Sequence, residues 1–147
     1  MTYYPILLIL HLLAAFVFIG TVFFEMIFLE NIRKRIPKEM MRLLEKEVGI
    51  RARQVIPWVL LILFSAGIGM AWFHRGALSH PISSQFGALL LLKIILAISV
   101  LCHFITVVIL QKKGKLTGKI SKYVHISVFC HVITIVILAK GMYYIHW

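Results

Sequence analysis

Four long apolar runs, separated by shorter polar segments, dominate the pattern of the chain. They cover about residues 3–29, 55–73, 86–110 and 123–144. About 20 apolar residues suffice for a helix to cross the hydrocarbon of a bilayer. Backbone that faces lipid must satisfy its own hydrogen bonds, so each run is expected to be a helix packed in a bundle. The pattern therefore predicts an all-α integral membrane protein, a four-transmembrane-helix bundle.

The connection between the first two runs has a helical pattern of its own. Pro37 precedes a stretch, 38–48, in which apolar residues recur at helical spacing, and Gly49 follows as a stop signal. Its apolar members are Met40, Met41, Leu43, Leu44 and Val48. We expect a short amphipathic helix that lies on the inner membrane surface. Docking of a partner protein is the alternative.

Composition and charge agree with a membrane protein. The chain has 147 residues, is 61% hydrophobic and carries a formal net charge of +11, which suits one membrane domain over residues 1–147 rather than a soluble fold. Of its 16 Lys and Arg residues, 8 lie within 33–53 and 5 within 112–122. This is the positive-inside pattern, so it argues against a nucleic-acid partner and places both connections inside.

The same rule orients the whole chain. With four spans and both basic connections inside, the N- and C-termini are expected on the outer, periplasmic side of a bacterial inner membrane. The first run has no basic segment before it and is longer than the core of a signal peptide, so we interpret it as a retained span. The lipid bilayer is thus the first partner. A redox partner in the membrane or periplasm and a homo-oligomer are also open.

The last two spans each carry a Cys-His pair, Cys102-His103 and Cys130-His131. If the two helices turn back near Thr117, each histidine lies 14 residues from the turn. At about 1.5 Å of rise per residue, the two imidazoles then lie at one depth. Because a histidine inside a membrane is costly, it indicates a functional site. The pattern predicts a metal or haem iron shared by the two rings.

Haem and copper are competing uses of this layer. Haem b needs two axial donors at one depth and small residues that admit the ring, which Ser65, Gly67 and Gly69 could provide. Copper(I) favours thiolate and imidazole donors, so Cys102 and Cys130 would join the two histidines, although neighbouring helix residues point about 100° apart. A third alternative is that the histidines only bond each other or a backbone carbonyl.

Three further ionisable residues of the apolar runs bear on the site or its charge balance, namely His11, Glu25 and Lys93. His11 is nearer the level of Lys93 than that of the other two histidines, so it could serve an outer cofactor or act with Lys93 beside a haem propionate. An unpaired charge in a bilayer is expensive. We therefore expect Glu25 to pair with Arg51 or Arg53, with proton transfer as the alternative.

Two segments resemble the copper-resistance D (CopD-type) membrane domain. Residues 10–20 carry His11, an aromatic residue seven positions on and Gly20, and residues 84–93 carry an aromatic-Gly-x-Leu-Leu-x-x-Lys pattern with Gly87 and Lys93. The order of these residues is also similar to HemJ-type four-helix membrane proteins, which bind haem b. The resemblance implies copper handling, haem binding or both.

The favoured interpretation is a membrane protein that binds haem b for electron transfer, as a b-type cytochrome component of a membrane oxidoreductase. Its predicted cofactor-binding residues are His103, His131, His11 and Lys93. The alternative is copper transport or copper binding through His103, His131, His11, Cys102 and Cys130. A cofactor-free accessory subunit, docked through its basic inner helix, is the third interpretation.

Overall fold

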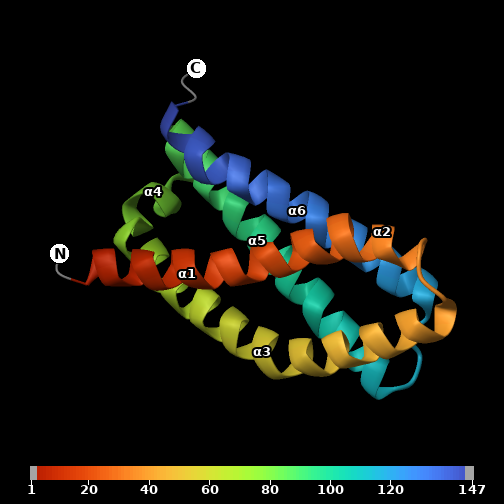
Figure 1. The fold of residues 1–147 in the computed structure, drawn as a ribbon. Helices are drawn as coiled ribbons and strands as arrows, with labels where there is room; N and C mark the ends of the chain where they lie inside the picture. The colour runs from red at the N-terminus through yellow and green to blue at the C-terminus, as the bar shows by residue number, and fades with distance from the viewer. Residues whose placement is uncertain (1–2, 145–147) are drawn as a thin grey trace. The chain divides into compact units, whose positions relative to one another are not determined.

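The computed structural model describes residues 3–144, and nearly all of them are helical (Figure 1). Four helical stretches are long and apolar enough to cross a membrane: Tyr4–Arg33, Lys38–Phe73, Gln85–Lys112 and Gly118–Tyr144. The described residues include no strand. An all-α protein with four candidate membrane-spanning helices is thereby confirmed. The outer location of the termini stays a prediction.

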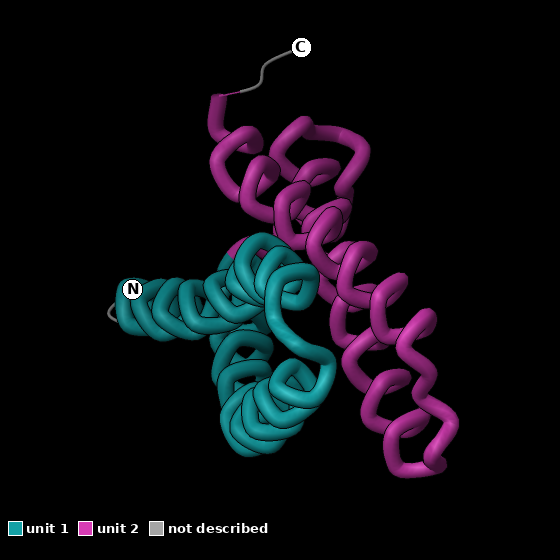
Figure 2. The backbone as a smooth tube through the Cα atoms, turned by 45° about the vertical axis from the view of Figure 1, so that its right-hand side comes forward, with its two compact units in different colours: residues 1–73 teal, residues 74–147 magenta. Residues whose placement is uncertain are grey.

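The chain divides into two compact units, residues 1–73 and residues 74–147 (Figure 2). Each unit contains a pair of long helices joined by a short turn. The assignment of residues 1–147 to one membrane domain stays a prediction.

In the first unit, α1 (Tyr4–Phe23) runs through a π-helical segment, η1 (Phe24–Leu29), into α2 (Glu30–Arg33). After a turn, α3 (Lys38–Phe73) returns along α1. Small and medium apolar residues lie between the two helices, namely Ala14, Phe18, Ile56, Leu60 and Ala66. Most other apolar side chains of this unit are exposed, as expected for helices whose outer faces contact lipid.

The helix α3 joins two elements that the sequence predicted separately, the amphipathic stretch 38–48 and the span 55–73. Its 36 residues correspond to about 54 Å of helix, against about 30 Å of hydrocarbon. Gly49 does not end the helix, because good helix formers surround it and tertiary contacts hold the segment before it. Met41 (4% exposed) packs inward, as does Leu29 (3% exposed) at the end of η1.

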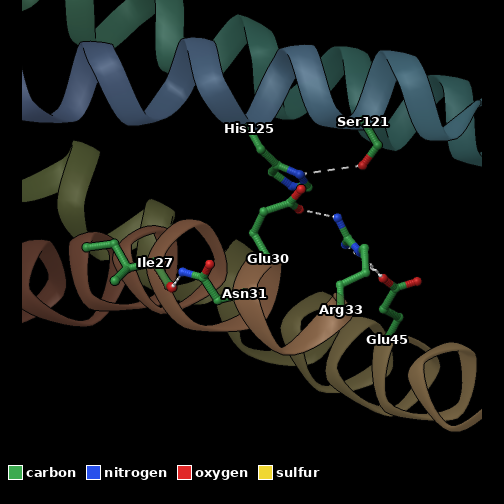
Figure 3. A network of polar contacts seen from close by, with 7 residues as sticks. All are labelled: Ile27, Glu30, Asn31, Arg33, Glu45, Ser121 and His125. Atoms are coloured by element: carbon green, nitrogen blue, oxygen red, sulfur yellow. Dashed lines mark hydrogen bonds and ion pairs between the residues drawn. The ribbon is translucent and has the colours of Figure 1, made fainter. Parts of the chain in front are cut away.

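Charged side chains connect α2 and α3 close to the turn between them (Figure 3). The guanidinium of Arg33 donates to Glu30 on the same helix and to Glu45 on α3, with Nη2 2.7 Å from Glu45 Oε1. Asn31 Nδ2 donates to the Ile27 carbonyl at 2.6 Å, within the π-helical segment. Arg33 therefore ties α2 to α3. The pairing of Glu25 with Arg51 or Arg53 stays a prediction.

The second unit begins with two short elements, α4 (Arg75–Ser79) and the 3₁₀ turn η2 (Pro81–Ser83). They pack on the start of α5 (Gln85–Lys112), which Ser84 caps by accepting from the Gly87 N–H at 3.1 Å. The helix α6 (Gly118–Tyr144) then returns antiparallel to α5. Gly114, with a φ of 65°, makes the turn between them, a conformation that glycine adopts without cost.

Gly87 is the tightest glycine of the second unit. A Cβ added there would lie 2.7 Å from the Ala77 carbonyl oxygen and 3.0 Å from the Pro81 carbonyl oxygen. Both are backbone atoms, so neither can move aside cheaply. We predict that Gly87→Ala costs about 1–3 kcal/mol of stability through overpacking. Thermal unfolding in detergent, followed by circular dichroism, measures the loss.

Gly76→Ala is the matched control, because a Cβ at Gly76 would have nothing within 4 Å. Its unfolding temperature should equal that of the wild type or exceed it slightly. Equal unfolding temperatures for Gly87→Ala and Gly76→Ala would show that α4 and η2 do not pack on α5 in this way.

Candidate histidine site between α5 and α6

The structure brings His103 of α5 and His131 of α6 together, as their equal distance from the turn predicted. Their ring centroids are 5.4 Å apart and the ring planes meet at 57°. Both residues are half-buried in the contact between the two helices. The two imidazoles thus share one layer of the second unit.

Each imidazole is fixed by its own helix. His103 Nδ1–H donates to the Ser99 carbonyl at 2.7 Å, and His131 Nδ1–H donates to the Ser127 carbonyl at 2.7 Å. A carbonyl only accepts, so Nδ1 carries the proton in both rings, and in a neutral imidazole Nε2 then carries the lone pair. The structure therefore assigns the same tautomer to both histidines.

The lone pairs are met by serine hydroxyls from the opposite helix. Ser127 Oγ–H donates to His103 Nε2 at 3.0 Å, and Ser99 Oγ–H donates to His131 Nε2 at 3.1 Å. Each serine therefore serves both rings: its carbonyl accepts from one histidine and its hydroxyl donates to the other. Four polar groups satisfy one another inside an apolar helix pair, which is what burial in lipid requires.

This reciprocity has its origin in an internal repeat. Residues 98–112 read ISVLCHFITVVILQK and residues 126–140 read ISVFCHVITIVILAK, identical at 11 of 15 positions. The helices run antiparallel, so the repeat is inverted and each half presents the same Ser-x-x-x-His face to the other. Val100 and Val128, which occupy equivalent positions, are both buried.

Ser99 was missed when the sequence was considered alone, and the bond of Ser127 to His103 was not foreseen. The Cys-His pairs were noted there, but the longer repeat that contains them was not. Aligning the two spans on Cys-His makes both serines visible, four residues before each histidine. Residues four apart share a helix face, so the serines could have been assigned to the histidine layer.

The cysteines point elsewhere. Cys102 and Cys130 are both exposed, one residue before the half-buried histidines. Among residues 3–144, no group of three or more His, Cys, Asp or Glu side chains is arranged to hold a metal ion. The structure thus brings the histidines together without the thiols. A ligand role for Cys102 and Cys130 stays a prediction.

His11 belongs to the first unit and lies in the contact between α1 and α3. Its Nδ1–H donates to the Leu63 carbonyl at 2.9 Å, and its ring lies on Gly67, where an added Cβ would be 3.2 Å from Cε1. The missing side chain at Gly67 is what lets the ring approach α3. Ser65 lines the neighbouring open groove together with Leu7, Leu10, Leu61, Ile62 and Ala66.

The predicted cooperation of His11 with Lys93 concerns residues of different units. Lys93 is half-buried on α5, ten residues before His103. Whether His11 and Lys93 serve one cofactor stays a prediction. The space that Ser65, Gly67 and Gly69 were expected to give a haem also stays a prediction. In the structure Gly67 lies against His11 and Gly69 lies against Leu7, both of α1.

The spacing of the two rings limits what they could hold. Metal-bound imidazole nitrogen lies about 2.0–2.1 Å from the metal, so a ring centre lies roughly 3.1 Å from it. Opposite axial ligands of one haem iron would then have ring centres about 6.2 Å apart, with a macrocycle between them. The ring centroids of His103 and His131 are 5.4 Å apart, so haem at this layer requires α5 and α6 to separate.

Comparison with known proteins does not assign this chain to a family. No family model matches the chain, and neither a curated protein nor a solved structure matches it. The resemblance to CopD-type and HemJ-type membrane proteins stays a prediction.

The serine hydroxyls should contribute measurably to stability. We predict that Ser99→Ala and Ser127→Ala each cost about 0.6 kcal/mol, and at most about 1.7 kcal/mol, as typical for hydrogen bonds between membrane helices. The inverted repeat predicts nearly equal losses. Unfolding in mixed detergent micelles measures them, and a double-mutant cycle of Ser127→Ala with His103→Ala should be non-additive.

Thr106→Ala and Thr134→Ala are the controls, because these hydroxyls bond only to carbonyls of their own helices, those of Cys102 and Cys130. Their stability should stay within experimental error of the wild type. Serine variants as stable as the threonine variants would exclude the two hydrogen bonds between helices.

Proposed function

We propose that the chain is an integral membrane protein that coordinates a redox-active metal through Nε2 of His103 and Nε2 of His131. The observation that carries this proposal is the tautomer of the two rings. Both keep the proton on Nδ1, bonded to a backbone carbonyl, and both turn the lone pair of Nε2 toward the other helix.

This arrangement matches the outer shell of histidine metal ligands. A metal-binding imidazole typically donates its other N–H to a carbonyl or carboxylate, which fixes the ring and raises its basicity. Here the carbonyls of Ser99 and Ser127 have that role. Two ligands with the same preset orientation support a site built for coordination rather than a chance contact.

We favour a bare copper ion over haem, because imidazole is a good copper ligand and ring centroids 5.4 Å apart are too close for a macrocycle between them. Haem b remains the second candidate, because the same two nitrogens are the axial donors that a b-type haem uses. Both candidates are redox metals ligated by imidazole, and bound copper or a Soret band distinguishes them.

The serine bonds do not block coordination. Each imidazole gives up one hydroxyl donor when Nε2 binds a metal. A serine hydroxyl within a helix has a second acceptor in the carbonyl four residues before it. Ser99 and Ser127 can therefore turn to their own helices, and no polar group of the pair is left unsatisfied.

Placement inside an apolar helix pair supports a function within the membrane. The pair lies between two helices that are long and apolar enough to cross a membrane, so a metal held there would be kept away from bulk water. Electron transfer at the bilayer and copper handling both need such a site, whereas a cofactor-free accessory role needs none.

Metal binding by the purified full-length chain tests the proposal. We predict about one copper(I) ion per chain, with His103→Ala and His131→Ala each lowering the affinity roughly tenfold or more, because each removes one of two ligands. Copper is measured by competition with a chromogenic chelator under reducing conditions. The visible spectrum of the same preparation, oxidised and reduced, reports haem through its Soret band.

His125→Ala is the matched control, since His125 lies on α6 near Ser121 and not in the pair (Figure 3). It should bind copper as the wild type does. A Soret band lost in both His103→Ala and His131→Ala would assign the two imidazoles to haem iron. The absence of both bound copper and a Soret band would contradict the proposal and leave a cofactor-free role.

A further inference from the structure

The second unit is entirely without acidic side chains. All five acidic residues of the chain are glutamates of the first unit: Glu25, Glu30, Glu39, Glu45 and Glu47. Residues 74–147 nevertheless contain eight basic side chains: Arg75, Lys93, Lys112, Lys113, Lys115, Lys119, Lys122 and Lys140. Within this unit no carboxylate side chain can neutralise them.

Five of these lysines gather at the turn between α5 and α6, within residues 112–122. Lys112, Lys113, Lys115 and Lys119 are exposed. The apolar run of α5 ends at Leu110, so the lysines begin two residues beyond the end of the membrane-spanning sequence. They therefore lie at the level where lipid headgroups meet water.

The backbone of this turn is ordered. Lys113 N–H donates to the Ile109 carbonyl at 3.0 Å, and Lys115 N–H donates to the Leu110 carbonyl at 2.9 Å. Thr117 Oγ1 accepts from the Ile120 N–H at 3.3 Å and so caps α6. An ordered backbone presents the lysines in one arrangement, which lowers the entropy lost on binding.

Lys119 is not placed for the stability of α6. Lys119 lies in its first turn, where no acidic residue is present. The N-terminus of a helix carries partial positive charge, so a lysine there is unfavourable. An anion at this end would be attracted by Lys119 and by backbone N–H groups that lack partners within the helix.

We propose that the α5–α6 turn binds the phosphate headgroups of anionic phospholipids, such as phosphatidylglycerol. Clusters of basic residues directly beside a membrane span attract anionic lipid, and each Lys or Arg in the cluster strengthens the attraction. The inner end of the first unit differs, because glutamates are interspersed with its basic residues and Arg33 is paired with Glu30 and Glu45. Anionic lipid should therefore associate more strongly with the α5–α6 turn.

The experiment compares two lipids around the full-length protein reconstituted in vesicles. Spin-labelled phosphatidylglycerol and spin-labelled phosphatidylcholine are added to separate samples, and electron paramagnetic resonance measures the fraction of each that the protein immobilises. We expect a preference of roughly threefold or more for phosphatidylglycerol at about 0.01 M salt, and close to none at about 1 M salt.

Two variants with equal charge loss locate the preference. Lys112, Lys113, Lys115 and Lys119 are changed to Gln in the first, and Lys34, Arg35, Lys38 and Arg42 in the second. The first should reduce the preference at least twofold more than the second. Circular dichroism and unfolding temperature verify that both variants fold.

Two results would overturn the proposal. One is equal immobilisation of the two lipids by the wild type at low salt. It would show that the lysines do not select anionic lipid and would favour an acidic protein partner for them. The other is an equal loss of preference in both variants, which would make the effect one of total charge.

Discussion

Every polar group of this protein that enters the hydrocarbon must find its partner within the protein. Water is absent there, and an unsatisfied group costs several kcal/mol. Three histidines of the long helices meet this condition in the same way, since His11, His103 and His131 all donate Nδ1–H to a backbone carbonyl. The carbonyl of Leu63 lies on a neighbouring helix, whereas those of Ser99 and Ser127 are local. This one requirement positions all three rings and decides which nitrogen of each ring carries the proton.

Sequence reasoning was most successful where this constraint acts on long segments. The apolar runs predicted four helices because length and hydropathy suffice for that inference. The approach of His103 and His131 followed from counting residues on either side of the turn. The first inference uses length and hydropathy and the second uses helix rise and chain reversal, and none of these depends on side-chain contacts.

The α2–α3 end of the first unit shows where sequence reasoning fails. Gly49 was interpreted as a stop, but α3 continues through it because Met41 packs inward and Arg33 holds Glu45. Such contacts join residues far apart in the chain, so local pattern cannot reveal them. The π-helical segment Phe24–Leu29 was likewise not predicted, since it depends on how the end of α1 meets its neighbours. The serine bonds of the histidine site were accessible through the repeat, but only once the spans were aligned.

The inverted repeat has a consequence for how the second unit assembles. Each half could in principle pair with the same half of another chain, since the two faces are nearly the same. The short turn at Gly114 keeps the halves of one chain at a high effective concentration, so pairing within the chain outcompetes exchange between chains. Deleting residues from that turn, so that the chain could no longer reverse there, would remove this advantage and open the way to swapped dimers.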